Sequence, residues 1–214
     1  MEQAQKCMII GASPLQDGRV FKEFLPEEYF IICADGGFET ALHFGVQPDL
    51  VIGDFDSAAD LPPDDLPTIL LPVEKDVTDM QAAVMEGFKR GYSSFVLIGG
   101  MGGPRLDHTI ANMQVLDYIA EHGGQALMAD STSKIFLIAN GKLTLTSMKG
   151  AIVSVFPFKE PTCVVTYAGL QYPLDHGALV TGGTLMGVSN AIVEDTADII
   201  VHSGMALILV TKVS

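Results

Sequence analysis

Short apolar runs alternate with segments of helical spacing in the first half of the chain, and this alternation restricts the possible folds more than any other feature. The runs are rich in branched residues and too short for helices, so they predict buried strands. They cover residues 6–10, 29–34, 50–52, 68–71 and 94–98. Apolar strands separated by helices are typical of a parallel sheet covered on both faces. We therefore expect an N-terminal α/β domain with a Rossmann-like parallel sheet.

The pattern changes at Asn140-Gly141, a pair that strongly favours a turn. From there on, short runs rich in threonine, valine and isoleucine alternate with turns, and no segment has convincing helical spacing. The runs cover residues 142–146, 151–157, 163–167, 191–194, 199–202 and 205–212. This pattern is typical of a β-sandwich or a flattened barrel, and we expect a sandwich. The predicted domains are therefore an α/β domain at 1–139 and a β-sandwich at 140–214.

Composition excludes several classes of protein. Of 214 residues, 48% are apolar and 18% charged, which allows a sizeable core. The formal net charge of −14 argues against nucleic acid or an anionic membrane as a partner. No apolar run approaches the length of a membrane span, and the polar N-terminus does not have the pattern of a signal peptide. The widely spaced Cys7, Cys33 and Cys163 predict buried free thiols in a cytoplasmic protein.

Acidic residues follow two of the predicted strands directly. Asp54 and Asp56 come after the run at 50–52, and residues two apart in extended backbone point to the same side. Such close carboxylates repel each other, so either a hard cation such as Mg²⁺ neutralises them or they belong to an acidic turn. Asp35 ends another strand, and carboxyl ends of parallel strands share one edge of a sheet, where ligands gather. The three residues together favour a metal site.

Two further aspartates, Asp76 and Asp79, lie at the start of a predicted helix whose apolar face runs from Met80 to Phe88. Thr78 and Gln81 fit a capping box, which places Asp79 in the first helical turn. The helix dipole favours a negative charge there, so Asp79 has a structural explanation. Asp76 precedes the cap and has no such explanation.

The segment at 99–108 combines a strand end, a run of glycines and a helix start. This layout lets backbone N–H groups contact a phosphate, and Arg105 supplies a suitable cation. The spacing is neither that of a P-loop nor that of the dinucleotide fingerprint. Asp107 fits either a phosphate site or the N-cap of the helix, and His108 either a catalytic role or a buried hydrogen-bonded position. A second glycine-rich segment, 182–190, taken alone favours a bulged loop over a binding loop.

Five motifs occur in one order: Ala-Asp-Gly-Gly at 34–37, Gly-Asp-Phe-Asp-Ser at 53–57, Lys-Asp-Val-Thr-Asp at 75–79, Gly-Gly-Pro-Arg-Leu-Asp-His at 102–108, and Gly-Val-Ser-Asn at 187–190. In this combination the chain resembles thiamine pyrophosphokinase over nearly its whole length. The resemblance implies transfer of the diphosphate of ATP to the hydroxyl of thiamine, giving thiamine diphosphate and AMP. It also implies a homodimer in which an α/β catalytic domain is followed by a β-sandwich, with the thiamine site shared between subunits.

The resemblance also assigns roles to residues. Asp54, Asp56 and Asp79 would hold Mg²⁺, with Asp35 close by, and these first three and Arg105 would be catalytic. Ser189 and Asn190 would bind thiamine. The nucleotide site would comprise Gly36, Gly37, Asp76, Thr78, Gly100, Gly102, Arg105, Asp107 and His108.

Three positions depart from the family pattern. Some relatives place a tryptophan against thiamine, and this chain has none, so another aromatic or an apolar residue such as Met186 would serve. Pro104 is inserted before Arg105, and Lys75 stands where some relatives have glutamine.

Two alternatives remain open from the sequence. A diphosphokinase of the same architecture could act on another alcohol, such as a hydroxymethyl pterin. A non-catalytic protein could bind thiamine or a nucleotide, although binding alone does not require so many carboxylates beside phosphate.

Overall fold

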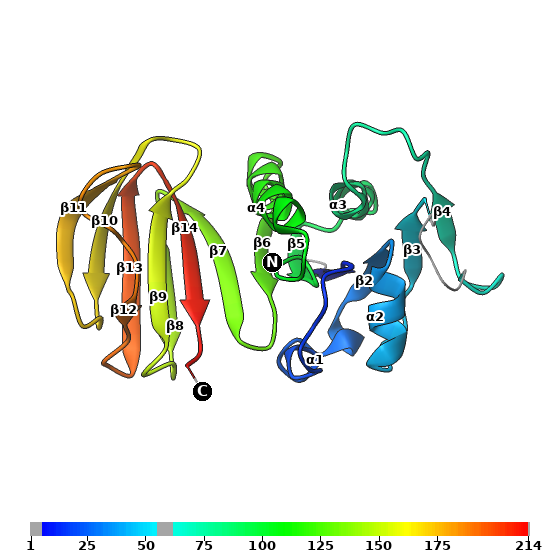
Figure 1. Cartoon of the computed structure of the whole chain (residues 1–214), viewed down its shortest axis with the longest axis horizontal. Helices are drawn as coiled ribbons and strands as arrows, with labels where there is room; N and C mark the ends of the chain where they lie inside the picture. Colours follow the sequence, from blue (N-terminus) through cyan, green and yellow to red (C-terminus); the bar gives the residue numbers. More distant parts are fainter. Residues whose placement is uncertain (1–5, 55–61, 214) are drawn as a thin grey trace. The chain divides into compact units, whose positions relative to one another are not determined.

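The computed structural model describes residues 6–54 and 62–213. The chain divides into two compact units, Met1–Ser131 and Thr132–Ser214, drawn in Figure 1. The predicted boundary near Asn140 lies one strand later than this division. The reason is that β7 (Ser133–Ala139) pairs along its whole length with β14 (Met205–Thr211), which belongs to the second unit.

The first unit contains a parallel sheet, as the apolar runs predicted. Its strand order among the described residues is β6-β5-β1-β2-β3-β4, and every pairing is parallel. The strands are β1 (Lys6–Ile10), β2 (Phe30–Ala34), β3 (Leu50–Gly53), β4 (Thr68–Leu70), β5 (Ser94–Ile98) and β6 (Gln125–Ala129).

Helices cover both faces of this sheet (Figure 1). On one face lie α1 (Val20–Glu23), the 3₁₀ turn η1 (Pro26–Glu28) and α2 (Gly37–His43); on the other lie α3 (Asp79–Lys89) and α4 (Leu106–Glu121). Successive strand residues point to opposite faces. Met8 and Ile10 therefore join the core beneath α1 and α2, whereas Cys7 faces Gly87 of α3. The strands β1, β2, β3 and β5 are buried on both sides, which explains why they are almost wholly apolar, whereas the edge strand β4 is largely exposed.

A side-chain cap marks the start of α3, whereas α4 begins without one. The Gln81 N–H donates to Thr78 Oγ1 at 3.2 Å, so α3 begins with Asp79 in its first turn, as predicted. Helix α4 begins at Leu106, and Arg105 occupies its N-cap position. Asp107 lies in the first turn of α4, so its interpretation as the N-cap is wrong.

The second unit is a β-sandwich in which two antiparallel sheets share one core. Within residues 132–213 the sheet orders are β12-β9-β14-β7 and β11-β10-β13-β8. Side chains from both sheets, such as Val153, Ile208, Val165 and Ile199, belong to one buried cluster. Strands not yet given bounds are β8 (Lys142–Thr146), β9 (Ile152–Pro157), β10 (Thr162–Ala168), β11 (Leu174–Val180), β12 (Asn190–Ala191) and β13 (Thr196–Ser203).

Strand β11 was missing from the sequence prediction. Its Asp175, His176 and Gly177 interrupt the apolar alternation, and His176 adopts a left-handed backbone with φ of 48°. The pairing of β10 with β11 shifts register between Val165 and Tyr167. A bulge of this kind removes the period-two signal that predicts a strand.

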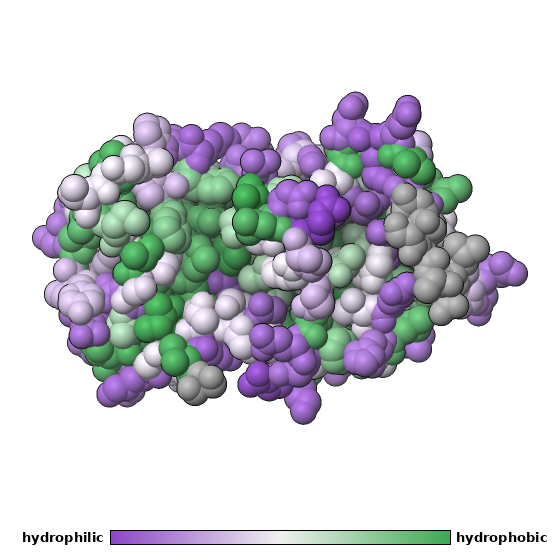
Figure 2. Space-filling view, viewed as in Figure 1, coloured by the Kyte–Doolittle hydropathy of each residue, from purple (hydrophilic) through white to green (hydrophobic). Residues whose placement is uncertain are grey.

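Hydrophobic residues are interspersed with hydrophilic ones on the face drawn in Figure 2. Among the described residues, no helix has both the length and the apolar character needed to cross a membrane.

Candidate active site

The strand order reverses between β1 and β5, and a crevice of the first unit lies at this position. From β1 the chain adds β2, β3 and β4 on one side, and then returns to add β5 and β6 on the other. Ligands of such sheets bind beyond the strand ends at this switch point. A cavity of about 80 Å³ lies here, lined by Gly11, Ala12, Ser13, Ala34, Asp35, Thr78, Asp79, Met80, Gly99, His108 and Asn112.

The loops after β1 and β5 approach each other so closely that glycine is required. The Gly11 N–H donates to Ile98 O at 2.7 Å, and the Ser13 N–H donates to Gly99 O at 2.9 Å. Gly99 has φ of 65°, and a Cβ there would lie 2.3 Å from Gly11 O. Similarly, a Cβ on Gly37 would lie 1.9 Å from Ile10 O. The predicted glycine motifs therefore bring backbone to the crevice.

Asp35 and Asp54 follow the neighbouring strands β2 and β3 and lie at one edge. Asp35 has a left-handed backbone with φ of 48°, and its N–H donates to Ile52 O at 2.7 Å. A Cβ on Gly53 would lie 3.3 Å from Asp35 Oδ1, so the Asp35 carboxylate borders the end of β3. Asp56, the other aspartate of that motif, lies outside the described residues.

Lys75 joins Asp54 to Asp79. Its Nζ lies 2.7 Å from Asp54 Oδ2 and 3.1 Å from Asp79 Oδ1. Burial by itself lowers the pKa of Lys75, but the two carboxylates outweigh burial, so the pKa is raised and the side chain stays charged. Asp79 Oδ1 is buried and accepts no aligned hydrogen bond from the described residues. Asp35 and Asp79 thus line the crevice, and Asp54 is joined to Asp79 through Lys75.

These oxygens suit a hard cation only in combination with a ligand. Within residues 6–54 and 62–213, no group of three or more His, Cys, Asp or Glu side chains is arranged to hold a metal ion. Mg²⁺ is usually held by one or two carboxylates together with substrate phosphates. Two aspartates that share one lysine, with one buried oxygen lacking a hydrogen bond, fit that kind of site.

Helix α4 holds the glycine segment in place through two side chains that the sequence analysis missed. The Gly102 N–H donates to Thr109 Oγ1 at 3.2 Å, and Asn112 Nδ2 donates to Gly100 O at 2.8 Å. Thr109 and Asn112 are among the few buried polar residues of the described chain. The available signal was their spacing of three, which places both on the inner face of the helix.

Arg105 and Asp107 pair with each other at the exposed start of α4. Arg105 Nε lies 3.0 Å from Asp107 Oδ1, and one of its terminal nitrogens, Nη2, lies 2.7 Å from Oδ2. The guanidinium lowers the pKa of Asp107 to about 2. His108 is exposed and lines the crevice, so its interpretation as a buried histidine is wrong. Asp76 is exposed as well.

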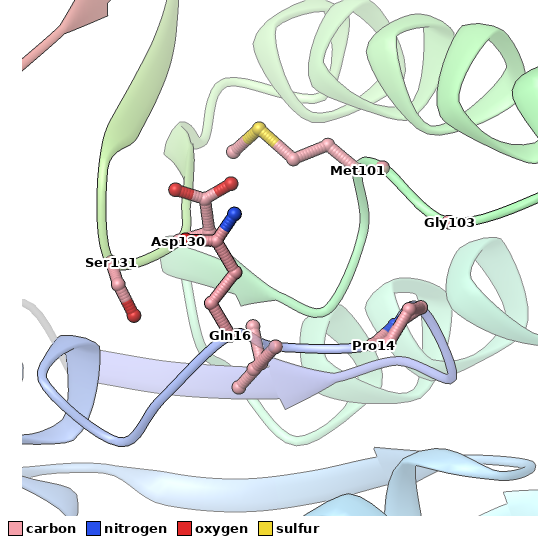
Figure 3. A pocket seen from close by; sticks show the side chains of 8 residues that line it. Pro14, Gln16, Met101, Gly103, Asp130 and Ser131 are labelled. Atoms are coloured by element: carbon pink, nitrogen blue, oxygen red, sulfur yellow. The ribbon is translucent and has the colours of Figure 1, made fainter.

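A larger cavity of about 290 Å³ adjoins the glycine segment (Figure 3). Figure 3 shows the side chains of Gln16, Met101 and Asp130 directed toward one another on one side of it. The Ser131 hydroxyl donates to Asp17 O at 3.0 Å and ties the end of the first unit to the loop after β1. The residues that line this cavity are Pro14, Leu15, Gln16, Met101, Gly102, Gly103, Asp130 and Ser131.

The second unit has a different kind of pocket, with a volume of about 240 Å³ and a mostly apolar lining. The lining residues are Tyr167, Tyr172, Pro173, Leu174, Leu179, Leu185, Met186, Gly187, Val188 and Asn190. The Tyr167 hydroxyl is buried and has no hydrogen-bond partner among the described residues. Burial raises its pKa, so the group stays neutral.

Asn190 and Ser189, the predicted thiamine residues, differ in position. The Asn190 amide engages the backbone of Tyr172 twice: Oδ1 accepts from the Tyr172 N–H at 2.9 Å, and Nδ2 donates to Tyr172 O at 2.8 Å. Asn190 therefore positions Tyr172 at the pocket. Ser189 is exposed, with φ of 58°, and its N–H donates to Ser154 Oγ at 3.2 Å. It is absent from the pocket lining.

Carboxylates and glycine loops at the ends of parallel strands suit the binding of phosphates, and the apolar pocket of the sandwich suits an organic ring. Residues 21–128 match the family model described as the catalytic domain of thiamin pyrophosphokinase, and residues 142–206 match the one described as its vitamin B1 binding domain. The chain belongs to the thiamin pyrophosphokinase family. It is an enzyme that transfers the diphosphate of ATP to the hydroxyl of thiamine, giving thiamine diphosphate and AMP.

Solved structures show the same fold over nearly the whole chain. Thiamine pyrophosphokinase from Bacillus subtilis has a TM-score of 0.83 at 22% identity, covering 97% of this chain and 99% of its own. The enzyme from Geobacillus thermodenitrificans has a TM-score of 0.82 at 25% identity, with coverage of 98% and 99%. Yeast thiamin pyrophosphokinase has a TM-score of 0.78 at 16% identity, with coverage of 100% and 88%. A search among curated proteins found no match.

Proposed function

We propose that the transfer takes place at the crevice between β1 and β5, where Asp54 and Asp79 would hold Mg²⁺ together with the triphosphate of ATP, with Asp35 close by. The observation that carries this proposal is the convergence of these carboxylates from three separate parts of the chain, with Asp54 and Asp79 on one lysine. Asp56 completes the set from outside the described residues. The bound metal neutralises charge on the phosphate oxygens.

Backbone and side-chain donors then position the phosphates. The loops at Gly36, Gly37, Gly100 and Gly102 bring N–H groups to the strand ends. Arg105 exchanges part of its pairing with Asp107 for phosphate oxygens, which the exposure of that pair permits. Thr78 and His108 line the same crevice, and the exposed Asp76 precedes Thr78 by two residues. With the triphosphate fixed in this way, alignment of the thiamine hydroxyl with the β-phosphorus becomes the main requirement of the reaction.

The nucleoside of ATP occupies the cavity of about 290 Å³ beside the glycine segment. Gly102 lines this cavity and follows Gly100 of the phosphate loop, so the two parts of the nucleotide lie on one continuous segment. Asp130 and Gln16 offer hydrogen bonds to ribose hydroxyls or to the base.

Thiamine binds the pocket of the second unit. Tyr172 is 62% exposed and takes the place of the missing tryptophan, with its ring against the cationic thiazolium. The Tyr167 hydroxyl gives a polar atom of the thiamine ring system a partner, because it has none of its own in the described chain. The pocket is shared across a homodimer, as the family resemblance implies. The buried thiols, whose pKa values burial raises, fit the reducing cytoplasm.

The test is a product assay on purified protein with Mg²⁺–ATP and thiamine, in which AMP and thiamine diphosphate form in equal amounts. We expect Asp54→Asn and Asp79→Asn each to lower turnover by about a hundredfold or more, with an unchanged circular dichroism spectrum. Near-normal turnover in both variants would overturn the metal role. A hydroxymethyl pterin offered in place of thiamine should yield no AMP.

A further inference from the structure

Lys75 is enclosed to a degree that is unusual for a lysine. Its side chain is 12% exposed, whereas the ion-paired Lys89 and Lys142 are 75% and 50% exposed. Lysine is seldom buried unless it is paired, and Lys75 is paired twice. One partner, Asp54, follows β3, and the other, Asp79, lies four residues beyond Lys75, in the first turn of α3.

The ammonium lies between the two carboxylates, at 2.7 Å and 3.1 Å. A metal ion bound by both carboxylates would require the same position, and the two cations would repel each other there. Lys75 and a divalent cation therefore exclude each other from this pair.

The lysine contact is also incomplete on one side. Asp54 Oδ2 accepts a hydrogen bond from Lys75 Nζ at 2.7 Å, but Asp79 Oδ1 is buried without an aligned hydrogen bond in the described chain. The ammonium at 3.1 Å neutralises Asp79, but this contact is less well directed than the hydrogen bond to Asp54. The arrangement fits a counter-ion that leaves when a better one arrives.

We propose that Lys75 is an internal counter-ion that holds Asp54 and Asp79 together in the metal-free enzyme, opposes the binding of a free divalent cation, and moves its ammonium to the triphosphate when Mg²⁺ enters with ATP. The inference rests on the proposed metal role of these aspartates. It makes metal binding depend on the nucleotide: the displaced ammonium gains phosphate oxygens only when ATP is present.

Direct binding of Mn²⁺ alone, followed by electron paramagnetic resonance on the full chain without nucleotide, tests the proposal. Lys75→Gln should bind Mn²⁺ about tenfold more tightly than wild type, because a positive charge has left the site. Lys89→Gln is the matched control, since it removes the same charge from the exposed side of α3 and should leave Mn²⁺ affinity unchanged. Lys75→Arg keeps the charge and should remain as weak as wild type. Equal affinities for wild type and Lys75→Gln would overturn the proposal.

Thermal unfolding provides a second readout. Without divalent ions, Lys75→Gln should melt at a lower temperature than wild type, because two close carboxylates lose their counter-ion, and Mn²⁺ should restore most of the loss. Wild type should respond to Mn²⁺ only when ATP is added. A wild-type shift with Mn²⁺ alone that matches the shift of Lys75→Gln would contradict the counter-ion role.

Turnover is measured separately, so that the two proposals fail in different ways. If wild type released no AMP while Lys75→Gln still gained Mn²⁺ affinity, the counter-ion role would stand and the assigned transfer reaction would be wrong. In an active enzyme, Lys75→Gln should raise the KM for Mg²⁺–ATP and leave the KM for thiamine unchanged.

Discussion

The candidate ligand sites of the two units differ in chemical character. The first unit gathers charge at the ends of parallel strands: two aspartates share Lys75, and backbone loops approach each other closely enough to require glycine. The second unit offers an apolar pocket with aromatic side chains and one buried hydroxyl that has no hydrogen-bond partner among the described residues. The first arrangement suits phosphates and a cation, whose recognition is electrostatic. The second suits an organic ring, whose recognition depends on shape and a few placed polar atoms.

This difference determines how each region tolerates change. Close backbone packing leaves no room for an added methyl group, so the crevice of the first unit should fail through sterics and charge. The pocket of the second unit has open volume and an exposed Tyr172, so it should fail through lost positioning of single groups.

The largest effect is expected for Gly99→Ala. Its φ of 65° and an added Cβ 2.3 Å from Gly11 O both oppose the native backbone, so we expect a loss of about 3 kcal/mol in the free energy of unfolding, measured by urea denaturation. The matched control is Gly91→Ala, which has φ of 90° but no atom within 4 Å of the new Cβ, and which should cost about 1 kcal/mol. Equal losses of stability in the two variants would show that the loops after β1 and β5 can move apart to accommodate the added methyl group.

Asn190→Ala addresses positioning in the second unit. It removes both hydrogen bonds to the Tyr172 backbone, so stability should fall by about 2 kcal/mol and the KM for thiamine should rise, with the KM for ATP unchanged. Asn190→Asp keeps the acceptor for the Tyr172 N–H and should lose about half as much. A change in the KM for ATP would contradict the assignment of Asn190 to the thiamine pocket.

Local sequence patterns predicted β1 to β5, the start of α3 and the acidic edge, because each depends on neighbouring residues. Thr78 and Gln81 cap α3 as expected, and Asp35 and Asp54 lie at adjacent strand ends. The pattern failed where pairing distant in sequence decides the conformation. Strand β11 forms around His176 and Gly177 because β10 supplies its partner through a bulge, and nothing in residues 174–180 alone indicates this.

The chemistry at the site shows the same limit. In the sequence, Lys75 was recognisable only as a departure from relatives. Its contact with Asp54 joins residues 21 positions apart and is created by the fold, so no local pattern indicates it. Thr109 and Asn112 were overlooked because polar residues on a helix are usually solvent-exposed, and only the packing of α4 turns them toward the glycine segment. The two hydrogen bonds between the Asn190 amide and the Tyr172 backbone likewise could not be predicted, because they join residues 18 positions apart.

Tyr167→Phe separates binding from stability. The hydroxyl has no hydrogen-bond partner in the described chain, so its removal should leave the melting temperature unchanged or slightly higher. The KM for thiamine should nevertheless rise about tenfold if the hydroxyl bonds to the substrate. Tyr172→Phe keeps the ring that faces the pocket and should alter neither quantity. An unchanged KM in Tyr167→Phe would place thiamine away from this hydroxyl.

The smallest effect is expected for Arg105→Gln, which tests how local the charge network of the first unit is. The pKa of Asp107 is about 2, below its ordinary 3.8, because Arg105 pairs with it. A carboxyl with a lowered pKa adds stability above its ordinary pKa and loses that contribution as the pH falls toward 2. Because both side chains are more than 60% exposed, the change in stability should be small.

Carboxyl NMR titration should instead show the pKa of Asp107 rising toward 3.8 in Arg105→Gln. The pKa of Asp198 in the second unit, which Lys142 and Thr144 lower, should not move. A shift at both carboxyls would show that the two regions are electrostatically coupled and that their contrast is one of degree.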